Sequence, residues 1–384
     1  MELRVDEREW VQFQWPYLVA FLGGEQRVTE LAYATGAFQR RREVESPSEL
    51  LQLLLTWAVA ERSLRETALL SAEAGMADVS DVALMKRFIR AGDWLGALLA
   101  EVLGQVQPQV PGFLRMRLID ASSIQRRGSR GTDARLHLSL DLSTHRIDQV
   151  ELTDAQAGET LDRFWFKPGE IVIADRGYAH RGGLYSVHNA GAYFLVRLPW
   201  SNVPLETIEG EPFDLMAALG SLPEASVQEF AVQFRSAEGK IVPCRFVATR
   251  KSEAAAMEAR RRALKERRKH GAIDPRTLEA AGYVFVLTNL PVQISSESVL
   301  QLYLFRWQVE MKFKTLKSVL HLGNVPVKSP ELLRVYVTAK LLVALLIDVF
   351  ISAAESFSPW GYPIPSLQLV ASDPSASEPD RHGH

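Results

Sequence analysis

The first third of the chain carries apolar residues at the spacing of amphipathic helices. Residues 46–75 and 79–104 hold leucine and alanine three or four positions apart, with charged residues between them. This period predicts helices in both segments. Ser48 and Ser80 are the predicted N-caps, because a serine side chain accepts a hydrogen bond from a free amide of the first turn. Residues 1–110 are therefore expected to form a helical domain.

Beyond residue 112 the period changes to that of strands. Short runs rich in Val, Ile and Leu occur at residues 115–124, 134–142, 146–153, 170–178 and 192–199. Helix-compatible segments lie between them at residues 157–166 and 181–191. Strands that alternate with helices predict a domain of the α/β class.

Residues 201–282 follow a different pattern. Residues 226–250 alternate like a β-hairpin, with Glu238 and Gly239 near its turn. Residues 258–269 then hold seven cations and two acids, which predicts a charged helix. A helix that faces DNA and a helix that faces only solvent fit this composition equally well. We expect the segment to be a mostly β insertion that also carries a basic helix.

The core pattern returns in residues 283–355. A strand pattern opens this segment, and Ser295 or Ser296 can cap the long helix that follows. Residues 111–200 would thus supply the first part of the core and residues 283–355 the second. Residues 356–384 are rich in Ser, Pro and Asp and are expected to be disordered, because they cannot bury enough apolar surface.

Composition narrows the class of protein. The chain has 384 residues, of which 47% are apolar, so it can bury a sizeable core in more than one domain. Its single cysteine, Cys244, excludes an intramolecular disulfide and a cysteine-cluster zinc site. The formal net charge is −2, so charge must be considered locally. Residues 341–350 are too short to span a bilayer and contain Asp348. We expect a cytoplasmic protein with no membrane segment.

One segment of the long helix, YLFRWQVEMKFKTLK, places a lone carboxylate among cations. On a helical wheel the following residues fall on one face: Tyr303, Arg306, Glu310, Lys314 and Lys317. A surface helix with ion pairs from Glu310 to Arg306 and Lys314 explains this pattern too, at a few tenths of a kcal/mol, roughly, per pair. The helix alone does not separate a structural role from a functional one.

Two aspartates favour the functional interpretation. Asp120 is expected to end the strand RLID, and Asp175 is expected to end the strand IVIAD. In open α/β sheets, binding sites form at the carboxyl ends of strands. Either aspartate alone is a common turn former or helix cap. Together with Glu310 on a packed helix, they predict a site of three carboxylates.

Three carboxylates suit the chemistry of phosphoryl transfer. Mg²⁺ and Mn²⁺ prefer hard oxygen ligands, and two such ions about 4 Å apart stabilise the attacking and leaving oxygens of an in-line displacement. Neighbouring cations would bind a DNA backbone, which contributes affinity without base specificity. We therefore expect two Mg²⁺ or Mn²⁺ ions at Asp120, Asp175 and Glu310.

The spacing of these residues resembles a known family. Tyr303, Arg306, Glu310 and Lys317 match the YREK signature of the insertion sequence 4 family of bacterial DDE transposases. The segments LIDASSIQ and IADRGY resemble the first and second catalytic blocks of that family, and they occur in the expected order. The similarity extends from about residue 114 to residue 350.

The resemblance implies a ribonuclease H-like catalytic core interrupted by a mostly β insertion. It implies that Asp120, Asp175 and Glu310 are the catalytic, metal-binding triad. It also implies DNA contacts by the other signature residues and by the second block, to which the helical stripe adds one lysine: Tyr303, Arg306, Lys317, Arg176, Tyr178 and Lys314. Gly177 also matches the second block.

The resemblance further implies a reaction and its partners. Strand hydrolysis at each transposon end frees a 3′-OH, which then attacks target DNA in cut-and-paste movement. Transposon-end DNA and target DNA are the expected partners, and two copies of the chain would hold two ends in a nucleoid-associated synaptic complex. Recognition of the ends is assigned to residues 1–110 by analogy. There, the turn at residues 75–78 between two helices gives a helix-turn-helix-like pattern, which an ordinary helical bundle would show as well.

Two alternatives stay open. A catalytically silent DNA-binding repressor or domesticated transposase would bind transposon ends without cleaving them. A metal-dependent nuclease would hydrolyse DNA without joining it to a target. The sequence has no G-x-S-x-G elbow and no Walker A motif, which argues against an α/β hydrolase and an ATP-driven enzyme.

Overall fold

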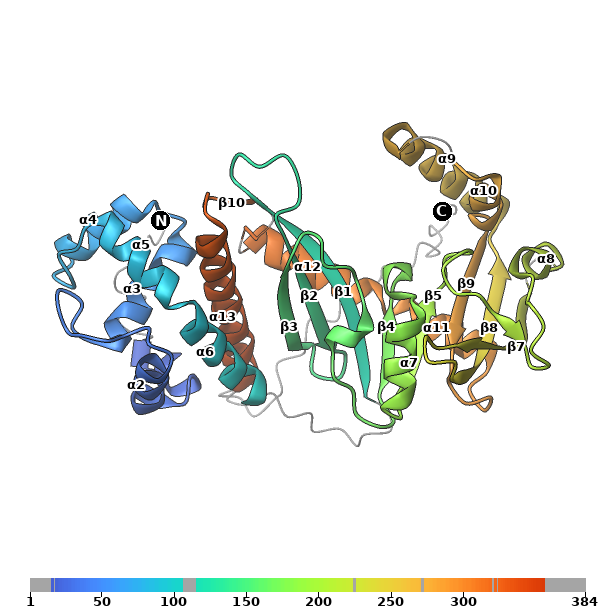
Figure 1. Cartoon of the computed structure of the whole chain (residues 1–384), viewed down its shortest axis with the longest axis horizontal. Coiled ribbons are helices and arrows are strands. Elements are labelled where there is room, and N and C mark those ends of the chain that lie inside the picture. Colours follow the sequence, from blue (N-terminus) through green and yellow to red (C-terminus); the bar gives the residue numbers. More distant parts are fainter. Residues whose placement is uncertain are drawn as a thin grey trace, which may run out of the picture.

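The computed structural model describes residues 15–16, 18–105, 115–223, 226–270, 273–319, 321–322 and 324–355. The predicted disordered tail, residues 356–384, lies outside these ranges. Within them, helices come first, a mixed sheet follows, and a long helix closes the described chain (Figure 1).

The N-terminal part is helical, as predicted. Its helices are α2 (Gly24–Ala34), α3 (Pro47–Ala60), α4 (Leu64–Glu73), α5 (Asp81–Arg90) and α6 (Gly92–Gln105). The last described helix, α13 (Pro330–Glu355), packs against α3, α5 and α6, and Figure 1 shows it beside α6. Trp57 of α3 joins them, with its ring 5.1 Å from that of Phe88 and 5.0 Å from that of Tyr336. The N-terminal helices therefore share a core with the end of the described chain.

The predicted cap at Ser80 is confirmed, but the one at Ser48 is wrong. Ser80 accepts a hydrogen bond from the amide of Ala83. In α3 the cap is Ser46, whose hydroxyl accepts from the amide of Glu49 at 3.1 Å. Pro47 decides this boundary, because proline is favoured at the first helical position, where no amide hydrogen is needed.

The strands form one ten-stranded sheet with the order β3-β2-β1-β4-β5-β9-β8-β7-β6, and β10 pairs with β1. The strands are β1 (Met116–Arg126), β2 (Ala134–Asp141), β3 (Arg146–Asp154), β4 (Ile171–Ala174), β5 (Tyr193–Arg197), β6 (Glu206–Thr207), β7 (Val227–Arg235), β8 (Ile241–Arg250), β9 (Tyr283–Thr288) and β10 (Asn324–Val325). Strands β1, β2 and β3 are antiparallel, and β1, β4 and β5 are parallel. The mixed α/β class predicted from the sequence is confirmed.

Helices cover both faces of this sheet. One face packs on α11 (Ser296–Leu304), α12 (Trp307–Val319) and α13, and the apolar core there continues into the N-terminal helices. The other face packs on α7 (Arg181–Asn189) and α8 (Leu215–Gly220). Because strands β4 and β5 are covered on both sides, their central residues are apolar.

The segment predicted as an insertion extends the same sheet. Strands β7 and β8 form the expected hairpin, and β8 continues the sheet through β9. Its turn contains Gly239, whose φ of +78° favours glycine. The basic run forms α9 (Glu253–His270), which α10 (Pro275–Ala280) follows. Figure 1 shows α9 and α10 beyond one end of β9.

Two predicted helices differ from the structure. Residues 157–166 contain only a short 3₁₀ turn, η2 (Leu161–Arg163), and its neighbours are not helical. The long helix after Ser295 is broken at residues 305–306 into α11 and α12. Ser295 is its cap, accepting from the amide of Ser298. No helix among the described residues is long and apolar enough to cross a membrane.

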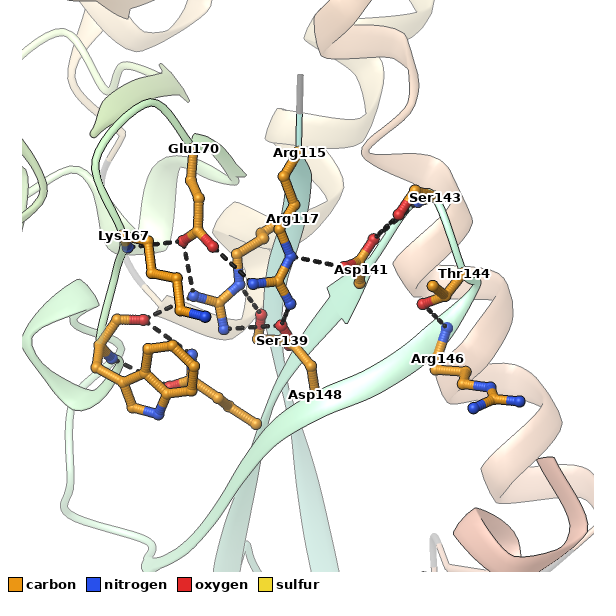
Figure 2. A network of polar contacts seen from close by, with 12 residues as sticks. Arg115, Arg117, Ser139, Asp141, Ser143, Thr144, Arg146, Asp148, Lys167 and Glu170 are labelled. Carbon is orange, nitrogen blue, oxygen red and sulfur yellow. Dashed lines mark hydrogen bonds and ion pairs between the residues drawn. The ribbon is translucent and has the colours of Figure 1, made fainter. Parts of the chain in front are cut away.

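A buried ionic network lies where β1 begins (Figure 2). Arg115 contacts Asp141 at 2.6 Å and Asp148 and Glu170 at 2.7 Å, and its side chain is 4% exposed. Arg117 contacts Asp148 at 3.0 Å and Glu170 at 3.2 Å and is fully buried. The network therefore joins β1, β2, β3 and the residue that precedes β4.

Candidate active site

The two aspartates lie at the same level on neighbouring parallel strands. Ile119 of β1 is in register with Ala174 of β4. The residues that follow them in the chain are Asp120 and Asp175. Strand β4 ends at Ala174, whereas β1 continues to Arg126. The prediction that Asp120 ends its strand is therefore wrong, but the structure does bring the two carboxylates to one place.

Asp120 is a partly buried carboxylate whose surroundings disfavour its charged form. Burial raises its pKa to about 6, and the negative charges of Asp175 and Glu159 act in the same direction. The amide of Ala121, which donates to Asp120 at 2.8 Å, and the guanidinium of Arg306 lower the pKa but do not offset burial. A bound cation would stabilise the negatively charged form of Asp120.

This shift predicts a pH-dependent stability of the metal-free protein. The pKa of Asp120 is about 6 in the fold and about 3.8 when exposed, so between these values the folded state binds more protons than the unfolded state. Stability should therefore fall as pH rises from 4 to 6, by about 2 kcal/mol in order of magnitude. Asp120→Asn should abolish this loss in urea titrations with EDTA. An unchanged pH profile would contradict the assignment, and the exposed loop variant Asp78→Asn is the matched control.

The break between α11 and α12 brings Tyr303 to the second aspartate. The hydroxyl of Tyr303 donates to Asp175 Oδ1 at 3.2 Å, and the side chain is otherwise nearly buried. Burial raises the pKa of Tyr303, and the charge of Asp175 adds to this effect, so the phenol stays protonated. Tyr303 is therefore placed to orient the carboxylate of Asp175.

Arg306 lies at the break and holds the third predicted carboxylate. Its guanidinium contacts Glu310 Oε1 at 2.6 Å, and its side chain is 19% exposed against 44% for Glu310. Its charge also acts on Asp120 and Asp175. Arg306 is thus a counter-ion shared by all three predicted acids. The ion pair proposed for a simple surface helix is present, and the one from Glu310 to Lys314 is not among the ion pairs of the described residues.

Two further cations predicted to contact DNA lie on α12. Lys314 and Lys317 are exposed on α12, and neither has an acidic partner in the part of the chain that the structure describes. The core face of α12 holds Val309, Phe313 and Leu316, which are buried. Phe305 lies in the break and is 38% exposed.

The second block has one residue that the sequence interpretation misplaced. Tyr178 is fully buried, and its hydroxyl lies 3.3 Å from His137 Nδ1 on β2. A buried phenol cannot contact DNA in this conformation, so the prediction of a DNA contact at Tyr178 is corrected to a role in holding the turn. Arg176 of the same turn, η3 (Arg176–Tyr178), is exposed and can reach a ligand.

The sequence interpretation missed Glu159. A Cβ on Gly177 would lie 1.9 Å from Glu159 Oε2, so the glycine makes room for this carboxylate. Glu159 pairs with Arg135 at 2.8 Å, and its charge raises the pKa values of Asp120 and Tyr178. The only signal in the sequence was an acid in a segment that resembled a helix.

The donor set fits a hard divalent cation in part. Asp120 and Asp175 follow residues that are in register on β1 and β4, and carboxylate oxygens are ligands that such cations prefer. No group of three or more His, Cys, Asp or Glu side chains among the described residues is arranged to hold a metal ion. Glu310 is instead paired with Arg306.

Comparison with known proteins places this geometry in a family. Residues 111–346 match the family described as the transposase DDE domain. That segment contains both aspartates, the strands that align them and the helix of Glu310. The chain belongs to this family and is a DNA transposase, an enzyme that processes DNA.

Curated relatives agree with the family match. The chain is 37% identical over 355 residues to the "Putative transposase InsL for insertion sequence element IS186A" of Escherichia coli (strain K12), covering 90% of this chain and 96% of the relative. It is 36% identical over 356 residues to the "Transposase for insertion sequence element IS421" of Escherichia coli, with the same coverage of both chains. A "Transposase for insertion sequence element IS231F" of Bacillus thuringiensis subsp. israelensis is 24% identical over 269 residues, which are 61% of this chain and 56% of that relative.

Proposed function

We propose that this transposase moves its own insertion sequence by cut-and-paste transposition, with Asp120, Asp175 and Glu310 as the catalytic triad. The observation that carries the proposal is the pair of aspartates at one level of β1 and β4, inside the matched domain. The spacing of Tyr303 and Glu310 supports a place in the insertion sequence 4 family. The mixed sheet with β1, β4 and β5 in parallel supports a ribonuclease H-like core.

Two Mg²⁺ or Mn²⁺ ions would be held by the carboxylates of these three residues. Such ions stabilise charge on the attacking and leaving oxygens of a phosphodiester. Tyr303 orients Asp175 through its hydroxyl, and Arg306 lies where it can exchange Glu310 for a DNA phosphate. The site would then have two states. In one, Arg306 pairs with Glu310, and in the other, Arg306 binds a DNA phosphate while Glu310 joins Asp120 and Asp175.

The remaining parts are assigned by the same proposal. Residues 1–110 would bind the transposon end, residues 111–200 and 283–355 would form the catalytic core, and residues 201–282 would be the insertion. Helix α5 supports end binding, since its Ser80-capped start follows a short turn after α4 and its last turn carries Arg87 and Arg90. Two copies of the chain would hold two ends together with target DNA.

The proposal is tested with labelled DNA that contains the gene's own genomic flanks. We expect purified protein with Mg²⁺ to cut a flank and to join the freed 3′ end to a target plasmid. Cutting without joining would identify a nuclease. Binding to the flanks with no cutting in Mg²⁺ or Mn²⁺ would identify a silent DNA-binding protein. Either of these two results would overturn the proposal.

Lys317 is expected to contact a DNA phosphate, because it is exposed on the helix of Glu310 and has no acidic partner among the described residues. Each phosphate contact adds about one unit to the slope of log Kd against log salt concentration. Lys317→Ala should therefore lower this slope by about one unit. Lys240→Ala, in the exposed β7–β8 turn, should leave it unchanged. Equal slopes for Lys317→Ala and the wild type would remove Lys317 from the DNA-binding surface.

A further inference from the structure

A cavity of about 960 Å³ opens beside the candidate active site. Its walls come from η3, the end of β5 with the loop that follows, and helices α9 and α10. It begins at Arg176 and Gly177, which directly follow Asp175 in the chain. A molecule bound at the aspartates can therefore continue into this cavity.

The cavity is lined by an excess of positive charge. Four cations contribute to the wall, which are Arg176, Arg197, Lys251 and Arg262. The acid among the lining residues is Glu258, which is already paired with Arg262 at 2.9 Å and with Arg261 at 2.8 Å. We call this feature the cationic groove and define it by those four cations.

Three of the four cations have no carboxylate partner within the described ranges: Arg176, Arg197 and Lys251. The ammonium of Lys251 donates to the carbonyl oxygen of Ala281 at 2.8 Å, which does not neutralise its charge. Burial lowers the pKa of Lys251, and the charges of Arg197, Arg176 and Arg262 lower it further, which shows that the cations face a common space. Cations brought together without acids are stabilised by an anionic ligand.

The other wall of the groove, formed by the loop after β5 with β9 and α10, is mostly apolar. Trp200 donates through Nε1 to Thr277 Oγ1 at 3.0 Å, and the guanidinium of Arg276 lies 4.1 Å from its ring centroid. Leu198 and Phe285 are buried beneath it. The groove therefore combines this apolar wall with cations from η3, β5, α9 and the residue that follows β8.

We propose that the cationic groove binds the phosphodiester backbone of the DNA strand that leaves the candidate active site. Guanidinium and ammonium groups are the side chains that bind phosphate oxygens, and a continuous strand presents phosphates at regular intervals. This inference rests on the proposed function, since it takes the strand at Asp175 to be the cleaved DNA. It adds Arg197 and Lys251 as positioning residues that the signature does not contain.

The first experiment measures binding of a labelled duplex of about 30 base pairs without metal, over a range of salt concentrations. Arg197→Gln and Lys251→Gln should each lower the slope of log Kd against log salt by about one unit. Lys240→Gln is the matched control, because it removes the same charge from an exposed turn of the same segment. Unchanged slopes for both groove variants would overturn the inference.

Rescue variants separate a lost contact from a lost fold. Arg197→Lys and Lys251→Arg keep the charge and should restore the wild-type slope, with melting curves like that of the wild type. A second test replaces single phosphates in the DNA by neutral methylphosphonates. One position should weaken binding of the wild type several-fold but not that of Lys251→Gln. If every position weakens both proteins equally, Lys251 contacts no phosphate.

The outcomes distinguish the groove from the catalytic proposal. If the wild type cleaves and joins DNA, and the groove variants have the same slope of log Kd against log salt as the wild type, the groove inference fails and the proposed function stands. If the groove variants have a lower slope of log Kd against log salt but the wild type neither cleaves nor joins DNA, the groove remains a DNA-binding site and the catalytic proposal fails.

Discussion

Glu310→Gln is expected to lower the rate of strand cleavage at a transposon end by about 100- to 1000-fold or more. The substitution keeps the size of the side chain and removes the negative charge that a divalent cation requires. The contact with Arg306 can persist through the amide oxygen, so the fold should be retained. Asp120→Asn and Asp175→Asn are expected to have effects of similar size, since their carboxylates are adjacent on β1 and β4.

The control for this prediction is Glu297→Gln. Glu297 is exposed in the first turn of α11, one helix away from Glu310, and is not among the predicted acids. Its variant should cleave at the wild-type rate, and Glu310→Gln should still bind DNA. Cleavage by Glu310→Gln at the rate of Glu297→Gln would remove Glu310 from the triad.

Arg115→Met is expected to destabilise the fold by about 3 to 5 kcal/mol. Arg115 contacts three buried carboxylates, and Arg117 pairs with two of them, Asp148 and Glu170 (Figure 2). Removal of Arg115 therefore leaves Asp141 without its guanidinium partner. Burial already raises the pKa of Asp148 against the opposing effect of both arginines. The measurement is the free energy of unfolding from urea titration. Arg261→Met, which removes an exposed ion pair with Glu258, should leave the midpoint unchanged.

A result near zero for Arg115→Met would contradict this account of the network. It would mean that the three carboxylates take up protons or water without cost. Because the network ties the starts of β1 and β3 to the end of β2 and to Glu170, its loss should also slow cleavage through disturbed strand register. Cleavage by Arg115→Met should recover at low temperature, whereas cleavage by Glu310→Gln should not.

The sheet was predictable because its strands are marked by local pattern. Each run of Val, Ile and Leu between polar turns became a strand, and the parallel pairing of β1 with β4 places Asp120 beside Asp175. The extent of β1 was predictable only in part, since the strand-like run reached residue 124 but Asp120 was expected to end the strand. Its residues beyond Asp120 are mostly polar, and they continue as a strand because β2 and β10 supply backbone partners from elsewhere in the chain.

The break between α11 and α12 left no sign in the sequence. Neither Phe305 nor Arg306 is a glycine or proline, and the helical period continues through them. The break is a tertiary effect, since it allows Tyr303 to reach Asp175 while Val309 and Phe313 stay in the core. A helical wheel assumes a straight axis and therefore could not show that Arg306 would lie between the acids.

Contacts between residues that are far apart in the chain also could not be predicted from the sequence. Arg197 and Lys251 belong to segments that looked like an ordinary strand end and a loop, and only the order β5-β9-β8 brings them together. Tyr178 is the opposite case. Its motif suggested an exposed contact, but the apolar core around β2 and β4 encloses the ring.

The most direct test of the central claim uses a transposon end that is already cut. A duplex with a free 3′-OH at the element's terminus, a target plasmid and Mg²⁺ would be incubated with the wild type, Glu310→Gln and Glu297→Gln. We predict that the wild type and Glu297→Gln join the 3′ end to the plasmid and that Glu310→Gln does not. Joining by Glu310→Gln, or none by the wild type in either Mg²⁺ or Mn²⁺, would contradict the claim that these three acids perform strand transfer.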